Sequence, residues 1–375
     1  MAGRMRRLGM LLVLCGWAWG GAQAQPQPLT RVTTGEIGGW LRLDASVAGV
    51  AGRWIVDTGS SHNLVSPAFA ARLSLREGGV RAAEAGAGRI QGRAVELPPV
   101  RIGAIERGGQ VALSADLGQV IGIGAQGIDG ILGAPFLDGL DVDIDLARWR
   151  IEFHPDAGSA CPAGFEAVPF SRVKGLPVLS LELPGPSQVR AVLDTGNPGG
   201  LLWFESRAAP MSAPGLRFEG ARLVVAESMA LGPLVRLHAP VVFFVSTGLQ
   251  AALGPDVDAL AGTALLDGAR MRLSLAQRRL CLEPARTPVP GGFGLLLAER
   301  DGSLHVRAVL AGSPAEQAGL RAGEVVTGWA GAVMPTGLVD AWEQAAGRQE
   351  LDVTVQGKAP VRLKRGYFAP RFGVP

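Results

Sequence analysis

The sequence predicts a mainly β protein made of two similar β-barrel halves and a small α+β module after them. Three observations support this prediction. Segments of the first half recur in the second half, short apolar runs are separated by Gly, Pro and Asp clusters, and the pattern changes after the second half. The expected boundaries are 30–158 for the first half, 165–285 for the second half and 291–365 for the module.

The repeat consists of two segments that occur in the same order in both halves. The stretch "DGILGAPFLDGLDVDIDLARWRIEFHP" from Asp129 aligns without a gap on "DALAGTALLDGARMRLSLAQRRLCLEP" from Asp258. Upstream, "RWIVDTGSSHNLVS" from Arg53 aligns on "RAVLDTGNPGGLLW" from Arg190. An internal repeat of this kind indicates two structural units with the same fold.

Short strands are the elements that the pattern favours in each half. A short helix is expected after the first Asp-Thr-Gly turn, with Ser66 as N-cap and Pro67 at its first position. These features suit a barrel or a sandwich better than a doubly wound α/β sheet. The apolar runs that predict strands are Val95–Leu97, Ile144–Leu146, Val178–Leu183, Leu223–Val225 and Val241–Val245.

The first 24 residues have the features of a secretory signal peptide. Three arginines precede an apolar stretch over 8–19, and "AQA" at 22–24 is an A-x-A cleavage site. A short membrane anchor is the alternative, although a bilayer span needs about 18 apolar residues. A periplasmic or secreted location is therefore expected, with no stable membrane span in the mature chain.

The charge of the chain gives no indication of a nucleic-acid partner. The chain carries 36 basic and 33 acidic residues, and Arg4, Arg6 and Arg7 of the signal segment account for the difference. Beyond that segment the charges balance, whereas proteins that bind a phosphate backbone present a basic surface.

Cys161 and Cys281 are the cysteines that remain after residue 24. An even number of cysteines in an oxidising compartment permits a disulfide. Two separately buried thiols are the alternative, because a disulfide also requires that the two residues lie close together in space.

Two Asp-Thr-Gly triplets are the candidate reactive groups. Asp57 and Asp194 each follow three apolar residues, at equivalent places of the repeat. Two carboxylates that face each other at ~3 Å cannot both ionise, so they share one proton. The ionised member can then take a proton from water while the protonated member polarises an amide carbonyl. The alternative is that both aspartates only cap turns at strand ends.

The triplets and the apolar-Gly segment after each of them resemble the aspartic proteases. The run "IDGILGAPFLDGLDVDID" from Ile128 is especially similar to bacterial retropepsin-like proteins, and the likeness covers about 35–285. The resemblance implies two barrel lobes related by a pseudo-twofold axis, with Asp57 and Asp194 holding the attacking water and no cofactor. It also implies supporting residues: Thr58, Gly59, Ser60, Thr195, Gly196 and Asn197 beside the dyad, and Ile131, Leu132, Gly133, Leu260, Ala261 and Gly262 beneath it.

The second half departs from the pattern of the family. Pepsin-like enzymes place Ser or Thr after each triplet, where the hydroxyl bonds the outer carboxylate oxygen; Ser60 fits this pattern and Asn197 does not. Ala261 also stands where the first half has Leu132. Because one hydroxyl donor is missing, the dyad is expected to keep its shared proton to a higher pH than a pepsin dyad does.

The candidate flap is a glycine-rich hairpin of retropepsin type. Pepsins carry a flap tyrosine, but the single tyrosine of this chain, Tyr367, lies outside the two halves. The residues that suit the flap are Gly86, Ala87 and Gly88, before Ile90.

The segment after the expected linker Thr287–Gly292 resembles a PDZ domain. Its carboxylate-binding loop would consist of Gly292, Phe293, Gly294 and Leu295, and "AGSPAEQAGLRAGEVV" suits the helix and turn that follow. The resemblance implies that a peptide adds as a strand while the loop holds its terminal carboxylate. A docked module with no peptide in its groove is the alternative.

Two helices are expected in this module. The first has Ser313 as N-cap, Glu316 closing a capping box and Gly319 as its stop. The second covers Leu338–Ala346 and lies between strands near 304–309 and 351–355.

Two further patterns predict no chemistry. "GIGAQG" at 122–127 is followed by a glycine-broken apolar run rather than a helix, so it is interpreted as a loop and not as a dinucleotide site. The four histidines have no Cys or His at ligand spacing, and no metal site is predicted from them: His62, His154, His238 and His305.

Together these patterns favour an aspartic endopeptidase that acts on a peptide or an unfolded protein, with a PDZ module for substrate recruitment or regulation. The competing hypothesis is a non-catalytic peptide-binding or scaffold protein with a degenerate protease cleft. Asn197 and the divergence of the second half motivate that alternative.

Overall fold

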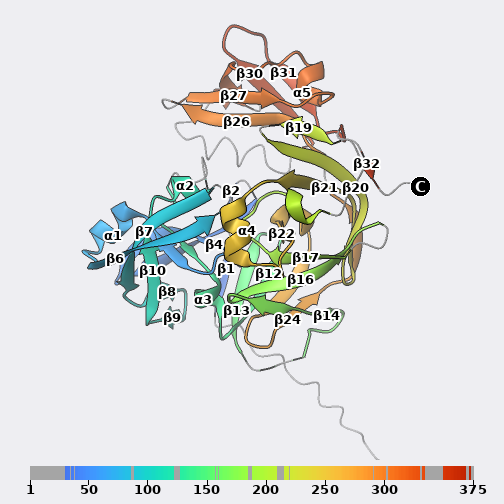
Figure 1. The fold of residues 1–375 in the computed structure, drawn as a ribbon. Helices are drawn as coiled ribbons and strands as arrows, with labels where there is room; N and C mark the ends of the chain where they lie inside the picture. The colour runs from blue at the N-terminus through green and yellow to red at the C-terminus, as the bar shows by residue number, and fades with distance from the viewer. Residues whose placement is uncertain are drawn as a thin grey trace, which may run out of the picture.

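The computed structural model of the chain describes residues 30–33, 35–37, 39–85, 88–121, 127–156, 158, 160–184, 188–208, 215–218, 220–289, 291–300, 303–329, 332–333, 349–368 and 371–372. In these segments the chain is mainly β, as the sequence predicts, and forms four sheets (Figure 1). No helix in them is long and apolar enough to cross a bilayer. The predicted signal peptide lies outside the described residues, as does most of the predicted GIGAQG loop.

The first sheet carries the first Asp-Thr-Gly turn. Its strands, from one edge to the other, are β6 (Glu77–Ala85), β7 (Gly88–Leu97), β10 (Gln110–Ser114), β5 (Asn63–Val65), β11 (Gly130–Leu132), β4 (Val50–Val56), β3 (Trp40–Val47), β8 (Val100–Ile102) and β9 (Ile105–Arg107), with β2 (Gly35–Ile37) paired to β3. The helices of this part are α1 (Pro67–Arg72), α2 (Gly118–Ile121) and α3 (Ala134–Leu137).

The second sheet carries the second Asp-Thr-Gly turn. Its strands are β15 (Ser171–Val173), β16 (Leu176–Glu182), β17 (Gln188–Leu193), β22 (Ala259–Ala261), β18 (Leu201–Phe204), β21 (Leu234–Phe244), β20 (Ala221–Leu231) and β19 (Leu216–Phe218). The helical segments of this part are η2 (Glu205–Arg207), α4 (Thr247–Leu253) and η3 (Thr263–Leu265).

The two sheets have the same order of strand pairing around their Asp-Thr-Gly turns. In the first sheet β11 lies between β4 and β5, parallel to β4 and antiparallel to β5. In the second sheet β22 lies between β17 and β18 with the same two orientations. β5 then pairs in parallel with β10, as β18 does with β21. Segments that are equivalent in the repeat therefore occupy corresponding strands.

The continuous apolar run before Asp57 follows from the position of β4 inside its sheet. Trp54 packs edge to face on Phe69 of α1, with the ring centroids 5.6 Å apart. The next residue, Ile55, faces the other side and joins a second cluster with Leu64 and Ile131. A strand that is covered on both faces carries apolar residues in succession rather than in alternation.

Two helices begin where the sequence predicts. The side chain of Ser66 accepts a hydrogen bond from the N–H of Phe69 (3.1 Å) at the start of α1. In the module, Ser313 caps α5 (Pro314–Gln317) in the same way, accepting from the N–H of Glu316 (3.2 Å). The predicted capping box is wrong in one respect: the carboxylate of Glu316 accepts from the N–H of Gly312, one residue before the cap.

A third sheet joins the two halves of the repeat. Its strands are β1 (Thr30–Thr33), β13 (Arg150–Pro155), β12 (Leu140–Asp145), β23 (Arg270–Ser274), β24 (Arg279–Leu282) and β14 (Glu166–Pro169). At its centre, β12 of the first half pairs antiparallel with β23 of the second half. The main hydrophobic core is likewise continuous through residues of both halves. The halves are therefore joined by backbone hydrogen bonds and by shared apolar packing.

The C-terminal module has a sheet and a hydrophobic core of its own. Its strands are β26 (Leu295–Arg300), β27 (Ser303–Val309), β28 (Val325–Trp329), β30 (Glu350–Val355) and β31 (Val361–Lys364), with β29 (Ala332–Val333) paired to β28. β27 and β30 correspond to the two strands expected there. The helix expected over Leu338–Ala346 lies outside the described residues.

The segments on either side of the module are anchored to the second sheet. β25 (Ala285–Pro288) pairs in parallel with β21, so the prediction of a linker from Thr287 is wrong for the first two residues of that linker. After the module, β32 (Arg371–Phe372) pairs in parallel with β20. The Tyr367 hydroxyl donates to the carbonyl of Val289, and its ring lies 4.9 Å from that of His238 on β21. Both ends of the module therefore contact the β20–β21 hairpin (Figure 1).

Cys161 and Cys281 form a disulfide, with their Cα atoms 5.5 Å apart. Cys281 lies on β24, opposite Ala167 of the edge strand β14. The bond therefore closes a loop of 120 residues between the end of the first half and the joining sheet.

We expect reduction of this disulfide to destabilise the chain by about 2–5 kcal/mol, because the bond limits the conformations of the unfolded chain. The measurement is the denaturant midpoint with and without reductant. The double variant Cys161→Ser/Cys281→Ser is the control, and its midpoint should not respond to reductant. A wild-type midpoint that stays constant after verified reduction would contradict this expectation.

Candidate active site

The two aspartates of the triplets lie at the ends of corresponding strands. Asp57 follows β4, and its N–H donates to the carbonyl of Leu132 on β11 (3.0 Å). Asp194 follows β17, and its N–H donates to the carbonyl of Ala261 on β22 (2.9 Å). Each parallel strand pair thus fixes the backbone of one aspartate.

The threonines of the two triplets exchange hydrogen bonds across the interface between the halves. The N–H of Thr58 donates to Oγ1 of Thr195 (3.0 Å), and the N–H of Thr195 donates to Oγ1 of Thr58 (3.1 Å). Each hydroxyl donates in turn to the opposite strand: Thr58 to the carbonyl of Leu193 (2.6 Å) and Thr195 to that of Val56 (2.8 Å). Both threonines are fully buried, so these four bonds hold the two turns together without water.

The two triplet glycines allow each turn to contact the carboxyl group of the other. A Cβ on Gly59 would lie 2.4 Å from Cγ of Asp194, and a Cβ on Gly196 would lie 2.3 Å from Oδ2 of Asp57. No side chain fits at these positions. Each glycine N–H also donates to the aspartate of its own turn, at 2.8 Å for Gly59 and 3.0 Å for Gly196.

The apolar-Gly segments pack directly beside the turns. Gly133 and Gly262 follow β11 and β22, where a Cβ would lie 2.3 Å from the carbonyl of His62 and of Gly199 respectively. The apolar members of the two segments are all buried: Ile131, Leu132, Leu260 and Ala261.

The carboxyl groups of Asp57 and Asp194 are buried and hydrogen-bonded to each other. Burial raises the pKa of Asp57, against the opposing effect of bonds from Asp194 and from the backbone. Burial and the neighbouring charge of Asp57 raise the pKa of Asp194 well above its ordinary value. A pair of this kind holds one proton between its two members, so one carboxyl is protonated while the other carries the charge.

The side chains of Ser60 and Asn197 do not differ in the way the sequence suggested. The Ser60 hydroxyl donates to the carbonyl of His62 (2.7 Å), so its hydrogen does not reach Asp57. Asn197 bonds within its own loop, accepting from the N–H of Gly199 (2.9 Å). Backbone N–H groups at both positions bond the carboxyls instead. Burial therefore raises both pKa values, and the charge of Asp57 raises that of Asp194 further, so a missing hydroxyl is not needed to explain them.

A further contact, which no sequence pattern indicates, supports the second turn. The indole N–H of Trp40, at the start of β3, donates to the carbonyl of Gly196 (2.7 Å). Next to it, the Thr263 hydroxyl donates to the carbonyl of Gly39 (2.7 Å). Trp40 belongs to no motif, and Thr263 directly follows the apolar-Gly segment of the second half; only the tertiary structure brings residues 39 and 40 to this loop.

The expected flap corresponds to the β6–β7 hairpin. Gly88 is the first residue of β7, whereas Gly86 and Ala87 lie outside the described residues. Near the end of β6 the Glu84 carboxylate approaches α4 of the second half, where a Cβ on Gly248 would lie 2.4 Å from Oε2 of Glu84. This hairpin of the first half therefore reaches a helix of the second half.

The expected carboxylate-binding loop lies in the C-terminal module and takes no part in the contacts of the dyad. Gly292 forms a bridge with Gly366. The Phe293 carbonyl accepts from the N–H of Ala315 (3.0 Å), which ties the loop to α5. Gly294 has a φ of +76°, a conformation that suits glycine, and Leu295 begins β26.

We expect Thr58→Val to destabilise the chain by about 1–3 kcal/mol, because the change leaves buried partners without hydrogen bonds. The N–H of Thr195 and the carbonyl of Leu193 lose their partners, while the size of the side chain is nearly kept. The measurement is the denaturant midpoint. Thr58→Ser retains the hydroxyl and serves as the matched control; an equal loss in both variants would contradict the role of the hydrogen bonds.

Comparison with known proteins supports an aspartyl protease-like function. Residues 43–136 match a protein-family model described as aspartyl protease. This segment contains the first Asp-Thr-Gly turn and β11, which packs beside it. No curated protein matches the chain.

Proposed function

We propose that the chain is an aspartic endopeptidase that hydrolyses peptide bonds with the Asp57/Asp194 dyad. The contact between the two buried carboxyl groups is the observation that carries this proposal. Aspartates that only cap turns have no need to face one another in a site shielded from water. The family match to the first half supports the same reaction class.

The proposed reaction uses one water and the shared proton. Ionised Asp57 accepts a proton from the water as its oxygen attacks the peptide carbonyl carbon, and Asp194 donates its proton to the carbonyl oxygen. In the tetrahedral diol that results, one hydroxyl returns its proton to a carboxylate while the other carboxyl protonates the amide nitrogen. The C–N bond then breaks, and the dyad is left with one proton, as before.

The substrate we propose is an extended peptide or an unfolded protein segment. The β6–β7 hairpin would act as the flap over this segment, since it already reaches α4 on the other half. The C-terminal module would act as a PDZ domain that recruits substrate or regulates the site, with a C-terminal peptide as its ligand. A periplasmic or secreted location is part of the same proposal, and the Cys161–Cys281 disulfide supports an oxidising compartment.

We expect Asp57→Asn and Asp194→Asn each to reduce cleavage of an unfolded protein by at least about 1,000-fold, because either change removes one half of the proton exchange. Asp129→Asn is the matched control, because Asp129 bonds the N–H of Arg53 outside the dyad.

The assay compares the mature wild-type chain with the three variants after each has been shown to be folded. Loss of cleavage in the two dyad variants, with cleavage retained in Asp129→Asn, supports the proposal. Equal cleavage in all four proteins would contradict a role of the dyad. No cleavage by the wild type at any pH would instead support the competing hypothesis of a non-catalytic peptide-binding scaffold.

Activity is expected to peak above pH 3.8, the ordinary pKa of an aspartate, because burial raises the pKa values of both dyad members. The acid limb should follow uptake of a second proton by the dyad, and the alkaline limb should follow loss of its shared proton. A pH-rate profile that peaks only in strong acid would contradict this expectation.

The same shift predicts a pH dependence of stability. A carboxyl with a raised pKa contributes stability below its ordinary pKa and loses it as the pH rises through the raised value. The free energy of unfolding of the wild type should therefore fall relative to that of the Asp194→Asn variant as the pH rises from acid to neutral. If the free energies of unfolding of the two proteins changed with pH in parallel, ionisation of the dyad would not destabilise the fold, and this expectation would be contradicted.

A further inference from the structure

The two strands at the centre of the joining sheet carry opposite charges. On β12, the aspartates at positions 141, 143 and 145 alternate with apolar residues and so share one face. In the antiparallel register with β23, Asp141 faces Ser274, Asp143 faces Arg272 and Asp145 faces Arg270. An acidic strand of the first half is thus paired with an arginine-bearing strand of the second half.

The central pair is a bidentate ion pair. The guanidinium of Arg272 donates from Nε to Oδ1 of Asp143 (2.5 Å) and from Nη2 to Oδ2 (2.7 Å). Arg272 is buried, and although burial opposes ionisation of Asp143, the bonds from Arg272 bring the pKa of that carboxyl below its ordinary value. The pair is therefore ionised, and its two-point geometry fixes the register of the strands.

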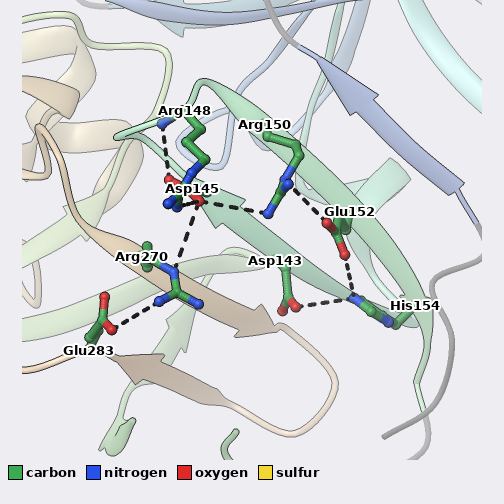
Figure 2. Close-up of polar contacts among 8 residues, drawn as sticks. All are labelled: Asp143, Asp145, Arg148, Arg150, Glu152, His154, Arg270 and Glu283. Carbon is green, nitrogen blue, oxygen red and sulfur yellow. Dashed lines mark hydrogen bonds and ion pairs between the residues drawn. The ribbon is translucent and has the colours of Figure 1, made fainter. Parts of the chain in front are cut away.

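The surrounding charges extend this arrangement (Figure 2). His154 on β13 lies 3.1 Å from Oδ2 of Asp143, and Glu152 pairs with Arg150 at 3.2 Å. Asp143, Glu152 and His154 bring one ligand atom each within 4.8 Å of one another, a spacing that also fits a metal ion. Arg272, however, already bonds both oxygens of Asp143, so the cluster is assigned to strand pairing.

The facing residues at the centre of the joining sheet are equivalent positions of the repeat. The alignment that matches Asp129 with Asp258 also matches Asp143 with Arg272. These two residues are equivalent in the two halves, and they are also the residues that face each other at the centre of the interface. If two first halves paired in this way, Asp143 would face a second Asp143. If two second halves did so, Arg272 would face a second Arg272.

We propose that the charges of β12 and β23 specify which halves can pair. The acidic strand of the first half pairs favourably with the arginine-bearing strand of the second half. It pairs unfavourably with a second copy of itself, because like charges placed directly opposite each other destabilise a strand pair. The joining sheet therefore favours one first half with one second half. This inference does not depend on the proposed proteolytic activity.

The test is a set of charge exchanges in the full-length, disulfide-intact chain, with denaturant midpoints as the measurement. Arg272→Asp places two carboxylates together and should lower the folding equilibrium constant by about 100- to 1,000-fold. Asp143→Arg should have a similar effect. The exchange Asp143→Arg/Arg272→Asp restores opposite charges, and it should recover stability to within about tenfold of the wild type.

Two further variants separate pairing specificity from general disruption. Arg272→Met removes the positive charge without adding a like charge, so it should lower the folding equilibrium constant less than Arg272→Asp does. Added salt should raise the constant of Arg272→Asp but not that of Arg272→Met. Arg101→Asp is the control at an exposed ion pair, because Arg101 lies 3.1 Å from Glu106. It should change the folding equilibrium constant by less than about fivefold.

Recovery in the double exchange supports the proposal even if neither single variant folds. The proposal is overturned if the double exchange is no more stable than the weaker single variant. It is also overturned if Arg272→Met and Arg272→Asp are equally unstable at every salt concentration.

Discussion

The reciprocal hydrogen bonds between Thr58 and Thr195 are the constraint on which the rest of the site depends. Each threonine uses both its N–H and its hydroxyl across the interface, and both residues are fully buried. If the halves separated, these groups would need water in place of the opposite chain segment. The position of each aspartate is therefore determined jointly by the two halves, and the shared core and the joining sheet serve to hold that geometry.

The close approach of the turns has an electrostatic cost. Gly59 and Gly196 bring each turn against the opposite carboxyl, which removes both carboxyls from water and raises their pKa values. Backbone N–H groups offset part of this cost, but they do not remove the repulsion between two charges. The site thus lowers the folding stability, and contacts elsewhere in the molecule must compensate for it.

The sequence predicts those features that depend on local or repeated patterns. The helix cap at Ser66, the strands before Asp57 and Asp194, and the corresponding strand order around the two turns all follow from such patterns. The sequence did not predict the contact of Trp40 with Gly196 or the destination of the Ser60 hydroxyl. The reason is physical: a hydroxyl or an indole N–H has several acceptors within reach, and packing between distant segments decides among them.

At three places a residue of the first half contacts the residue of the second half that is equivalent to it in the repeat. Each of the three pairs is complementary for a different reason. Thr58 and Thr195 stay identical because a hydroxyl both donates and accepts. Asp57 and Asp194 stay identical in sequence but differ in protonation, since one proton makes one carboxyl a donor and the other an acceptor. At position 143 a carboxylate could not face its copy without such a proton, and the second half carries Arg272 there instead. The halves therefore keep the same residue where it can serve as both donor and acceptor, and they differ at the pair Asp143/Arg272, where identity would place two like charges together.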